Sequence, residues 1–564
     1  MLRTLLLIFL LSIPFLSSSQ NVDIEAIKKN DPLKIGGALN ANVVYNSQKI
    51  TGMPPISYFL SGTVNFNFWG FDIPLSLNYS NRKFTYSQPF SYNFATLRPT
   101  YKWVSAEIGT CFTTFSPYSL SGHQFQGIGV NLTPNKWDIS LMNGRLLKAT
   151  IGDQNIPPSF NRMGRGIKTI YRGNNYSLGF SLFNAFDQKE SLALSDSLLP
   201  QAKENMVVGL EFSTTLFKRF QLSGDYHSSA LNSDKSQINN ERNTNKSISA
   251  LFLNRNANIE TFNSYKIALN TNLSKLNSII GVSYQKVDPN YTTLGGYYFV
   301  NDFQNISANY AQNLFSGKLN LTSSVGFQKD NLSRQKSSSQ NRVVGTVGVQ
   351  ANPSEKLNFN LNFSNFTSYS FISTVYDEIK QLNPFEQLDT LNYKQINQNF
   401  TSSINYALSK TEENQKSLNL NFSVMESINK QGDIVRIGQE SGFVNASLLY
   451  SSQYIKKRQG MSVGLNTSYN SIGIGNSYSL GPLLNMQKSF LKDRLSSSSS
   501  ISYIYSKDPT ANIQTGAINL RGNANYAINK QSGFTGNFGL TNVGGNTVKK
   551  QSYISLTVGF TSRF

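Results

Sequence analysis

The sequence is poor in cysteine, histidine and tryptophan. Of its 564 residues, one is Cys, two are His and three are Trp. A single cysteine, Cys111, cannot form an internal disulfide, so no cystine framework supports the fold. The chain also has no CxxC, HExxH or EF-hand pattern, which are the usual signatures of metal sites. We therefore predict no metal site and no cofactor.

The two histidines lack the neighbours that a hydrolase needs. His123 lies in SLSGHQF, close to Ser119 and Ser121, and His227 lies in DYHSSA. A Ser/His hydrolase also requires an orienting acid or amide and an oxyanion hole, and no residues at a recognisable spacing supply them. Both histidines are interpreted as ordinary polar residues, and the chain is predicted not to be an enzyme.

Charged residues and long hydrophobic runs are also scarce. Only 15% of the residues are charged, and the mean hydropathy is −0.31. After residue 19, no run approaches the roughly 20 apolar residues of a transmembrane helix. Residues 1–19 contain one positive charge, Arg3, followed by an apolar run, Leu5–Leu16, and then by small residues. This order is typical of a secretory signal peptide, so we expect cleavage before Gln20 and an exported protein.

The basic excess must therefore be explained outside the cytoplasm. The net charge is +20, which in a cytosolic protein would suggest nucleic acid as a partner. An exported chain rarely meets nucleic acid, so we predict no such partner. The expected partners of the positive charge are anionic headgroups of outer-membrane lipid, lipopolysaccharide or anionic solutes.

From about Gly36 to the C-terminus, the chain repeats one pattern. Strand-like runs of about 9–14 residues alternate apolar with small polar residues, the length that a tilted strand needs to cross a bilayer. In Leu357–Phe363, LNFNLNF, the apolar residues lie on one face and three Asn residues on the other. The predicted fold class is all-β: a single transmembrane antiparallel β-barrel over residues 36–564. A short periplasmic segment, residues 20–35, precedes it.

A soluble β-sandwich would also show this alternation. Three features favour the membrane barrel. The runs exceed the roughly 5–6 residues usual in a sandwich strand, their polar face is Asn, Ser, Thr and Gly rather than Lys and Glu, and short turns alternate with mostly longer loops. Outer-membrane barrels place their short turns in the periplasm. We predict about 26 strands with both termini periplasmic, in the outer membrane of a Gram-negative bacterium.

The three tryptophans all fall at predicted short turns. They are Trp69, Trp103 and Trp137. Amphipathic aromatic rings gather at membrane–water interfaces, so these residues are candidates for a membrane-interface belt.

The chain ends inside a predicted strand, Ser552–Phe564, with apolar residues at every second position. A terminal aromatic after such a strand resembles the assembly signal that the barrel-insertion machinery reads. Gly559, Phe560 and Phe564 fit that pattern, whereas Ser562 stands where an apolar residue is usual. We expect this strand to close the barrel against the first strand, because a free edge cannot face lipid.

Two segments carry a family resemblance. Arg98–Leu146 (RPTYKWVSAEIGTCFTTFSPYSLSGHQFQGIGVNLTPNKWDISLMNGRL) and Val287–Ile306 (VDPNYTTLGGYYFVNDFQNI) are similar to recurring segments of large Bacteroidota outer-membrane β-barrel proteins of uncharacterised function. The resemblance implies the barrel fold and the outer-membrane location. It supplies no site residues.

A barrel of about 26 strands encloses a wide lumen that would leak if left open. The candidate plugs are the loops Leu231–Phe262 and Tyr369–Gln395, the second with Phe371, Tyr376 and Phe385 as candidate plug or binding residues. The first functional hypothesis is a wide conduit for transport or secretion, gated by loops or by a partner protein. The alternative is a non-transporting scaffold that docks a surface or periplasmic partner.

Overall fold

A computed structural model describes most of the chain beyond its N-terminus. The described residues are 33–48, 54–68, 70–81, 94–152, 157–192, 200–235, 247–253, 258–296, 300–333, 341–369, 393–431, 434–435, 440–472, 475–547 and 549–564. Within them, no helix is long and apolar enough to cross a membrane.

The described residues form 28 strands and four short 3-10 helices. In chain order they are β1 Lys34–Asn46, β2 Ile56–Phe68, β3 Phe71–Ser80, β4 Phe94–Leu97, β5 Thr100–Tyr101, β6 Val104–Cys111, β7 Phe125–Leu132, β8 Trp137–Leu147, β9 Asn161–Arg172, β10 Tyr176–Gln188, η1 Lys189–Ser191, β11 Glu204–Leu216, β12 Phe220–Asn232, η3 Ala250–Phe252, β13 Ile259–Leu273, η4 Ser274–Leu276, β14 Ser278–Val287, β15 Phe303–Leu314, η5 Phe315–Gly317, β16 Leu319–Asp330, β17 Asn341–Ser354, β18 Leu357–Tyr369, β19 Tyr393–Lys410, β20 Asn414–Gln431, β21 Ile434–Val435, β22 Ser441–Tyr454, β23 Gln459–Ile472, β24 Gly475–Phe490, β25 Leu495–Asp508, β26 Ile513–Ala527, β27 Ser532–Gly545 and β28 Gln551–Arg563.

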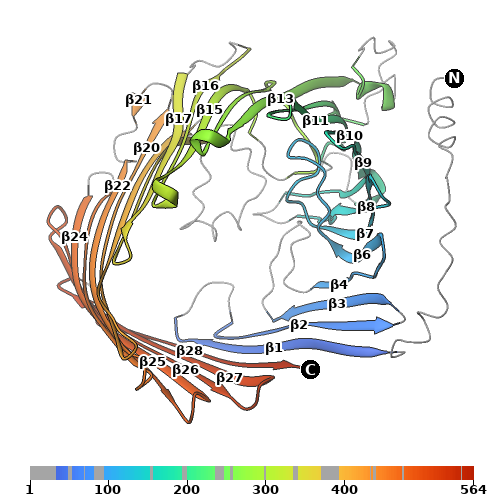
Figure 1. Cartoon of the computed structure of the whole chain (residues 1–564). Helices are drawn as coiled ribbons and strands as arrows, with labels where there is room; N and C mark the ends of the chain where they lie inside the picture. The colour runs from blue at the N-terminus through green and yellow to red at the C-terminus, as the bar shows by residue number, and fades with distance from the viewer. Residues whose placement is uncertain are drawn as a thin grey trace.

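These strands form one antiparallel sheet that closes on itself. β28 pairs with β1, from Ala38 opposite Arg563 to Asn46 opposite Ser555. Two of the 28 strands are not separate members of the wall, because β5 continues β4 between β3 and β6, and β21 only extends the end of β20. The wall therefore has 26 strands, which confirms the predicted all-β antiparallel barrel and its strand number. Figure 1 looks into the closed ring.

The alternation of the sequence becomes two faces of the wall. In β23, Met461, Val463 and Leu465 face outward and are 43–48% exposed. Ser462 and Asn466, between and beside them, face the lumen. In a closed barrel, every strand pairs its backbone N–H and C=O groups with its neighbours, so no unpaired edge meets lipid. The apolar outer face then allows the strands to cross a bilayer.

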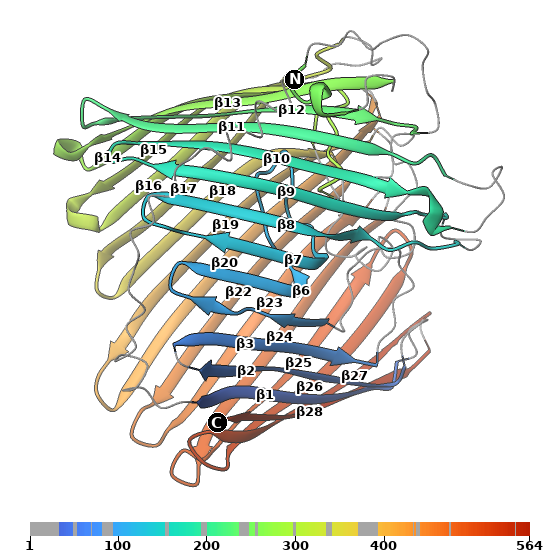
Figure 2. The same cartoon turned by 90° about the vertical axis from the view of Figure 1, so that its right-hand side faces the viewer.

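The two ends of the barrel differ. At one end, called here the short-turn end, connections such as those between β2 and β3 or between β17 and β18 have at most four residues. β1 starts and β28 stops at this same end (Figure 2). The opposite end, the long-loop end, carries the long connections. β1 begins at Lys34, two residues before the expected start, and residues 1–32, which include the expected signal peptide, lie outside the described residues.

Candidate functional site: a partly filled lumen

Two loops from the long-loop end fold into the barrel. The first inward loop, residues 112–124, joins β6 to β7, and the second, of which residues 288–296 and 300–302 are described, joins β14 to β15. Their central side chains are buried: Tyr118 is 6% exposed, Leu120 0% and Tyr291 1%. In Figure 1 the first loop lies inside the ring, against the strands of the blue-to-green half.

The inward loops bind each other. Leu120 and Gly295 form an isolated parallel bridge, and the Ser121 amide donates to the Gly295 carbonyl at 3.1 Å. The Tyr291 hydroxyl donates to the Tyr118 carbonyl at 2.8 Å. Burial raises the pKa of Tyr118 to about 12 and that of Tyr291 further, so both phenols stay neutral at physiological pH. The two loops thus form one plug, although about 175 residues separate them.

The plug shares a hydrophobic core with the lumen face of the wall. Gly166 on β9 lets Phe115 approach, because a Cβ there would lie 2.4 Å from the ring. Gly295 likewise lies against Phe183. Such a core on the lumen side is close-packed protein, not a water channel. Its members are Cys111, Phe115, Leu120, Phe125, Met142, Leu146, Phe183, Ala185, Val207 and Leu294.

A row of charges lies on the wall beneath the plug. Glu211, Asp225 and Lys266 face one another across β11, β12 and β13. Lys168 on β9 pairs with Glu211 at 2.8 Å and also donates to the Phe115 carbonyl of the first inward loop. The two carboxylates stand next to each other between the two lysines, and Lys168 ties the row to the plug by an ion pair on one side and a charge-assisted hydrogen bond to the loop on the other.

His227 and Asp225 are brought together here, although sequence reasoning assigned His227 no role. The Nδ1 of His227 is 3.7 Å from the Asp225 carboxylate, and the Ser181 hydroxyl lies nearby around Gly209. A hydrolase needs the His–acid contact at hydrogen-bond distance and an accessible nucleophile. His227 is 1% exposed and Ser181 2%. The arrangement therefore serves packing beneath Tyr118, whose ring centroid lies 5.2 Å from that of His227.

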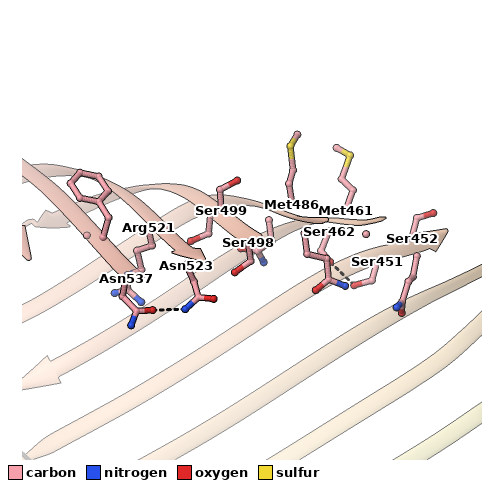
Figure 3. A pocket seen from close by; sticks show the side chains of 18 of the residues that line it. Ser451, Ser452, Met461, Ser462, Met486, Ser498, Ser499, Arg521, Asn523 and Asn537 are labelled. Carbon is pink, nitrogen blue, oxygen red and sulfur yellow. Dashed lines mark hydrogen bonds between the residues drawn. The ribbon is translucent and has the colours of Figure 1, made fainter. Parts of the chain in front are cut away.

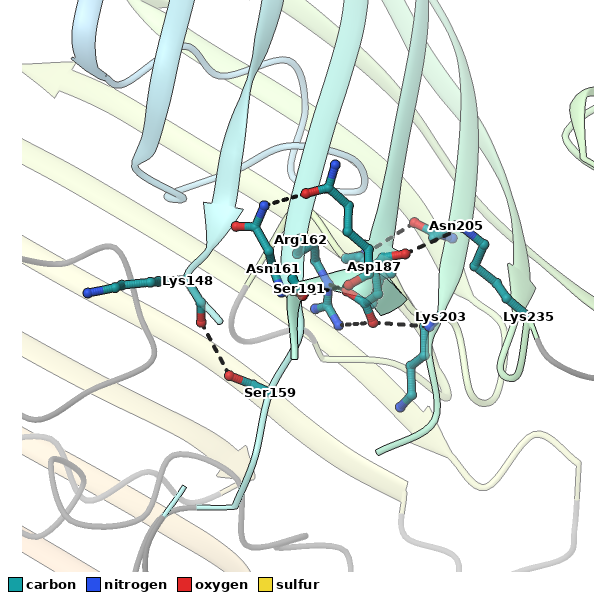
Figure 4. A network of polar contacts seen from close by, with 11 residues as sticks. Lys148, Ser159, Asn161, Arg162, Asp187, Ser191, Lys203, Asn205 and Lys235 are labelled. Atoms are coloured by element: carbon teal, nitrogen blue, oxygen red, sulfur yellow. Dashed lines mark hydrogen bonds and ion pairs between the residues drawn. The ribbon is translucent and has the colours of Figure 1, made fainter. Parts of the chain in front are cut away.

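The rim above the plug is fastened by a second polar network (Figure 4). Arg162 forms a two-pronged pair with Asp187, with bonds of 2.7 and 3.1 Å. Asp187 also accepts from the Lys203 amide at 3.0 Å. A bidentate Arg–carboxylate pair fixes geometry as well as charge, so the ends of β9, β10 and β11 are held in register where the plug enters.

The opposite half of the lumen has a different surface. Across β22–β28 the lumen face is mainly Ser, Thr, Asn and Gly, and its charged side chains are Arg521 and, near strand ends, Asp508 and Arg563. A hollow of about 810 Å³ lies on this wall. Figure 3 shows Asn523 and Asn537 on the lumen side of it, with Met461 and Met486 pointing the other way. This surface is polar and nearly uncharged.

His123, at the end of the first inward loop, makes the plug sensitive to acid. Its Nδ1 donates to the Gln124 carbonyl at 2.8 Å, and burial, assisted by Arg162, lowers its pKa from 6.5 to about 4. Between these values the unpacked loop binds more protons than the packed loop, so packing is fully favoured above pH 6.5 and weakens as the pH falls.

We expect the plug to lose about 2 kcal/mol of packing free energy between pH 7 and pH 5. Hydrogen exchange of residues 112–124, corrected for the intrinsic pH dependence, measures this loss. His123→Gln cannot take up the proton and should remove the pH dependence. An equal acid response in wild type and His123→Gln would contradict the assignment.

The predicted site residues are distributed as follows. Trp103 and Trp137 lie at the short-turn end, 43% and 41% exposed, and Trp137 packs on Tyr171. Trp69 lies outside the described residues, as do Phe371, Tyr376 and Phe385. The belt and the role of the loop Tyr369–Gln395 therefore stay predictions.

The C-terminal residues lie at the seam of the barrel. Gly559 faces the lumen, where a Cβ would lie 2.3 Å from the Asn42 amide oxygen. Phe560 packs on Phe534 on the outer face, with ring centroids 5.1 Å apart. Phe564 exchanges backbone hydrogen bonds of 2.8 and 3.0 Å with Gly37.

The prediction that the loop Leu231–Phe262 plugs the lumen is wrong for residues 247–253, the described middle part of this loop. Residues 247–253 pack on the outward face of the wall, against Met206, Val208 and Ala230. This outward segment follows a strand whose outward apolar residues offered a better-matched surface than the polar lumen. The first inward loop was missed as a plug; its signal was a connection rich in aromatic residues and without charge, CFTTFSPYSLSGHQF.

Comparison with known proteins gives only distant likenesses. No protein-family model and no curated protein matches the chain. A ferric enterobactin receptor (PfeA) from Pseudomonas aeruginosa is 10% identical over 94% of this chain and 80% of its own, with a TM-score of 0.40. The P pilus usher (PapC) translocation pore is 12% identical over 94% and 99%, at 0.39. The FrpB iron transporter from Neisseria meningitidis is 10% identical over 96% and 83%, at 0.36. The chain is thus similar to these barrels in outline only, and the similarity gives no information about cargo.

Proposed function

We propose that this protein is an outer-membrane conduit whose lumen is partly closed by its own loops. The observation that carries the proposal is the asymmetry of the lumen. The inward loops fill the side of β6–β15 with a packed core, whereas the wall of β22–β28 presents hydroxyl and amide groups around a hollow. A pure scaffold has no need of a polar wall inside its barrel.

The orientation is part of the proposal. The short-turn end, with both strand termini, lies in the periplasm, because outer-membrane barrels have short periplasmic turns and longer external loops. The inward loops then enter from outside the cell. Trp103 and Trp137 then mark the periplasmic interface.

The chemistry of the open wall favours uncharged polar cargo. Amides and hydroxyls exchange hydrogen bonds with sugars or peptide groups at little net cost, and a wall with few charges holds no ion strongly. We therefore expect a measurable conductance of the purified barrel in a planar bilayer, with weak ion selectivity, and entry of neutral sugars into liposomes that contain it. A barrel that passes neither ions nor sugars would contradict the conduit.

The scaffold alternative is favoured by one feature, the outward segment 247–253. Its Ile248, Leu251 and Phe252 are 47%, 47% and 38% exposed, an apolar patch of the kind that protein interfaces use. A protein that is recovered in stoichiometric amount with the wild type, and is lost when these three residues are changed to Ser, would support docking. Recovery of the barrel without a bound protein would contradict the scaffold alternative and favour the conduit.

A further inference from the structure

The outward face of β7–β11 changes character toward the long-loop end. One cross-strand row is wholly apolar: Val130, Leu141, Ile167, Leu182 and Val208. In the next row, toward the long-loop end, Asn143, Arg165 and Asn184 stand side by side on β8, β9 and β10. The row beyond contains Arg145 and Phe186. This is the wall that faces the viewer in Figure 2.

A hollow of about 530 Å³ lies across the first two rows. Val130, Leu141 and Ile167 line it toward the short-turn end, and Asn143 and Arg165 line it toward the long-loop end. The surface of the hollow itself is almost wholly apolar, so the polar and basic side chains stand at its long-loop edge.

The two outward arginines have no counter-ion among the residues that the structure describes. Among the ion pairs of the described residues, none includes Arg145 or Arg165. Arg165 donates to the Asn184 side chain at 3.1 Å and lies over the Phe186 ring at 5.4 Å. The Nε of Arg145 is enclosed and has no described hydrogen-bond partner.

The cations on the lumen face of these strands, by contrast, are paired with carboxylates. On the same strands, inward Arg162 pairs with Asp187 at 2.7 Å and inward Lys168 with Glu211 at 2.8 Å. On the outward face, Glu204 shares the row of Arg145 but lies three strands away, which separates the two backbones by roughly 14 Å at the usual strand spacing. An unpaired cation on a lipid-facing wall is unfavourable unless an anion of the membrane meets it.

We propose that this hollow binds lipopolysaccharide, with a phosphate of its lipid A part on Arg165 and Arg145 and an acyl chain over the apolar row. The choice of lipid rests on the orientation in the proposed function, which places the long-loop end in the outer leaflet. Lys235 lies on Phe186 at 5.3 Å and adds positive charge beside the same ring. Guanidinium groups bind phosphate in a bidentate manner, which gives the site its preference for a phosphorylated lipid.

Native mass spectrometry of the full barrel in mild detergent, with purified lipid A added, tests the inference. We expect Arg165→Gln and Arg145→Gln each to weaken lipid A binding about tenfold, the loss of one charge-assisted contact. Lys329→Gln is the matched control, an outward cation on β16 remote from the hollow, and should bind as the wild type does. Heat-modified migration in gels shows that each variant is folded.

Two results would overturn the inference. One is lipid A binding that survives in both single arginine variants, which would place the lipid elsewhere. The other is equal binding of phosphatidylglycerol, or displacement of lipid A by excess inorganic phosphate, which would show a general anion surface. Lipid A binding and conductance are measured separately. Loss of the lipid-binding proposal therefore does not affect the conduit proposal, and a barrel without measurable conductance does not affect the lipid-binding proposal.

Discussion

Replacing the first inward loop by a two-residue turn is expected to raise the single-channel conductance several-fold. Cys111 and Phe125 lie opposite each other in the β6–β7 pair, so residues 112–124 can be exchanged for Asn-Gly, a turn that joins paired strands directly. The change removes Phe115, Tyr118 and Leu120 from the lumen. It also leaves the second inward loop without its partner.

The gain in conductance follows from the distribution of the core. Among the described residues, the two inward loops fill the β6–β15 side of the lumen. The wall beneath them carries Glu211, Asp225 and Lys266, and water reaches these charged groups once the plug is removed. The thiol of Cys111, which is fully buried in the wild type, should then react with maleimide at neutral pH. This readout reports removal of the plug independently of conductance.

The matched control changes the outward segment instead. Ile248, Leu251 and Phe252, replaced together by Ser, remove apolar groups from the outer face and should leave conductance and thiol reactivity as in the wild type. A plug variant with a reactive Cys111 but an unchanged conductance would contradict the gating role of the inward loops. It would show that the barrier lies elsewhere in the barrel.

The wall of this barrel could be predicted from local pattern, and its plug could not. Alternation fixes which residues of a strand face lipid, as in Met461, Val463 and Leu465, and strand length together with connection length fixes the number of strands. Whether a loop folds inward depends on a surface made by other strands. The contact of Leu120 with Gly295 joins segments that no local pattern connects.

The plug is built from two segments that are far apart in the chain. Arg98–Leu146 and Val287–Ile306 each contain one inward loop with its flanking strand residues, and the two loops bind each other. The Thr293 hydroxyl donates to the Ser119 carbonyl at 2.6 Å, inside a core that excludes water. The plug therefore depends on a close fit between these two segments.

Deleting Phe564 is expected to lower the amount of folded barrel in the outer membrane about tenfold. The residue makes two backbone hydrogen bonds to Gly37 across the seam. Each is worth roughly 1 kcal/mol, and together they exceed the roughly 1.4 kcal/mol that corresponds to a factor of ten. The measurement is the fraction of protein that migrates as the heat-modifiable folded species in outer-membrane preparations. Phe538→Ala, an outward aromatic within β27, is the matched control and should assemble normally.

Refolding of the purified chain into detergent separates two reasons for the loss. Phe564→Ala keeps both hydrogen bonds of the seam and removes only the ring, which is 50% exposed. If the ring is what the insertion machinery reads, Phe564→Ala assembles poorly in cells and refolds normally in vitro, whereas the deletion fails in both. Normal amounts of both variants in the membrane would contradict the terminal signal and leave the β1–β28 register alone as the device that closes the barrel.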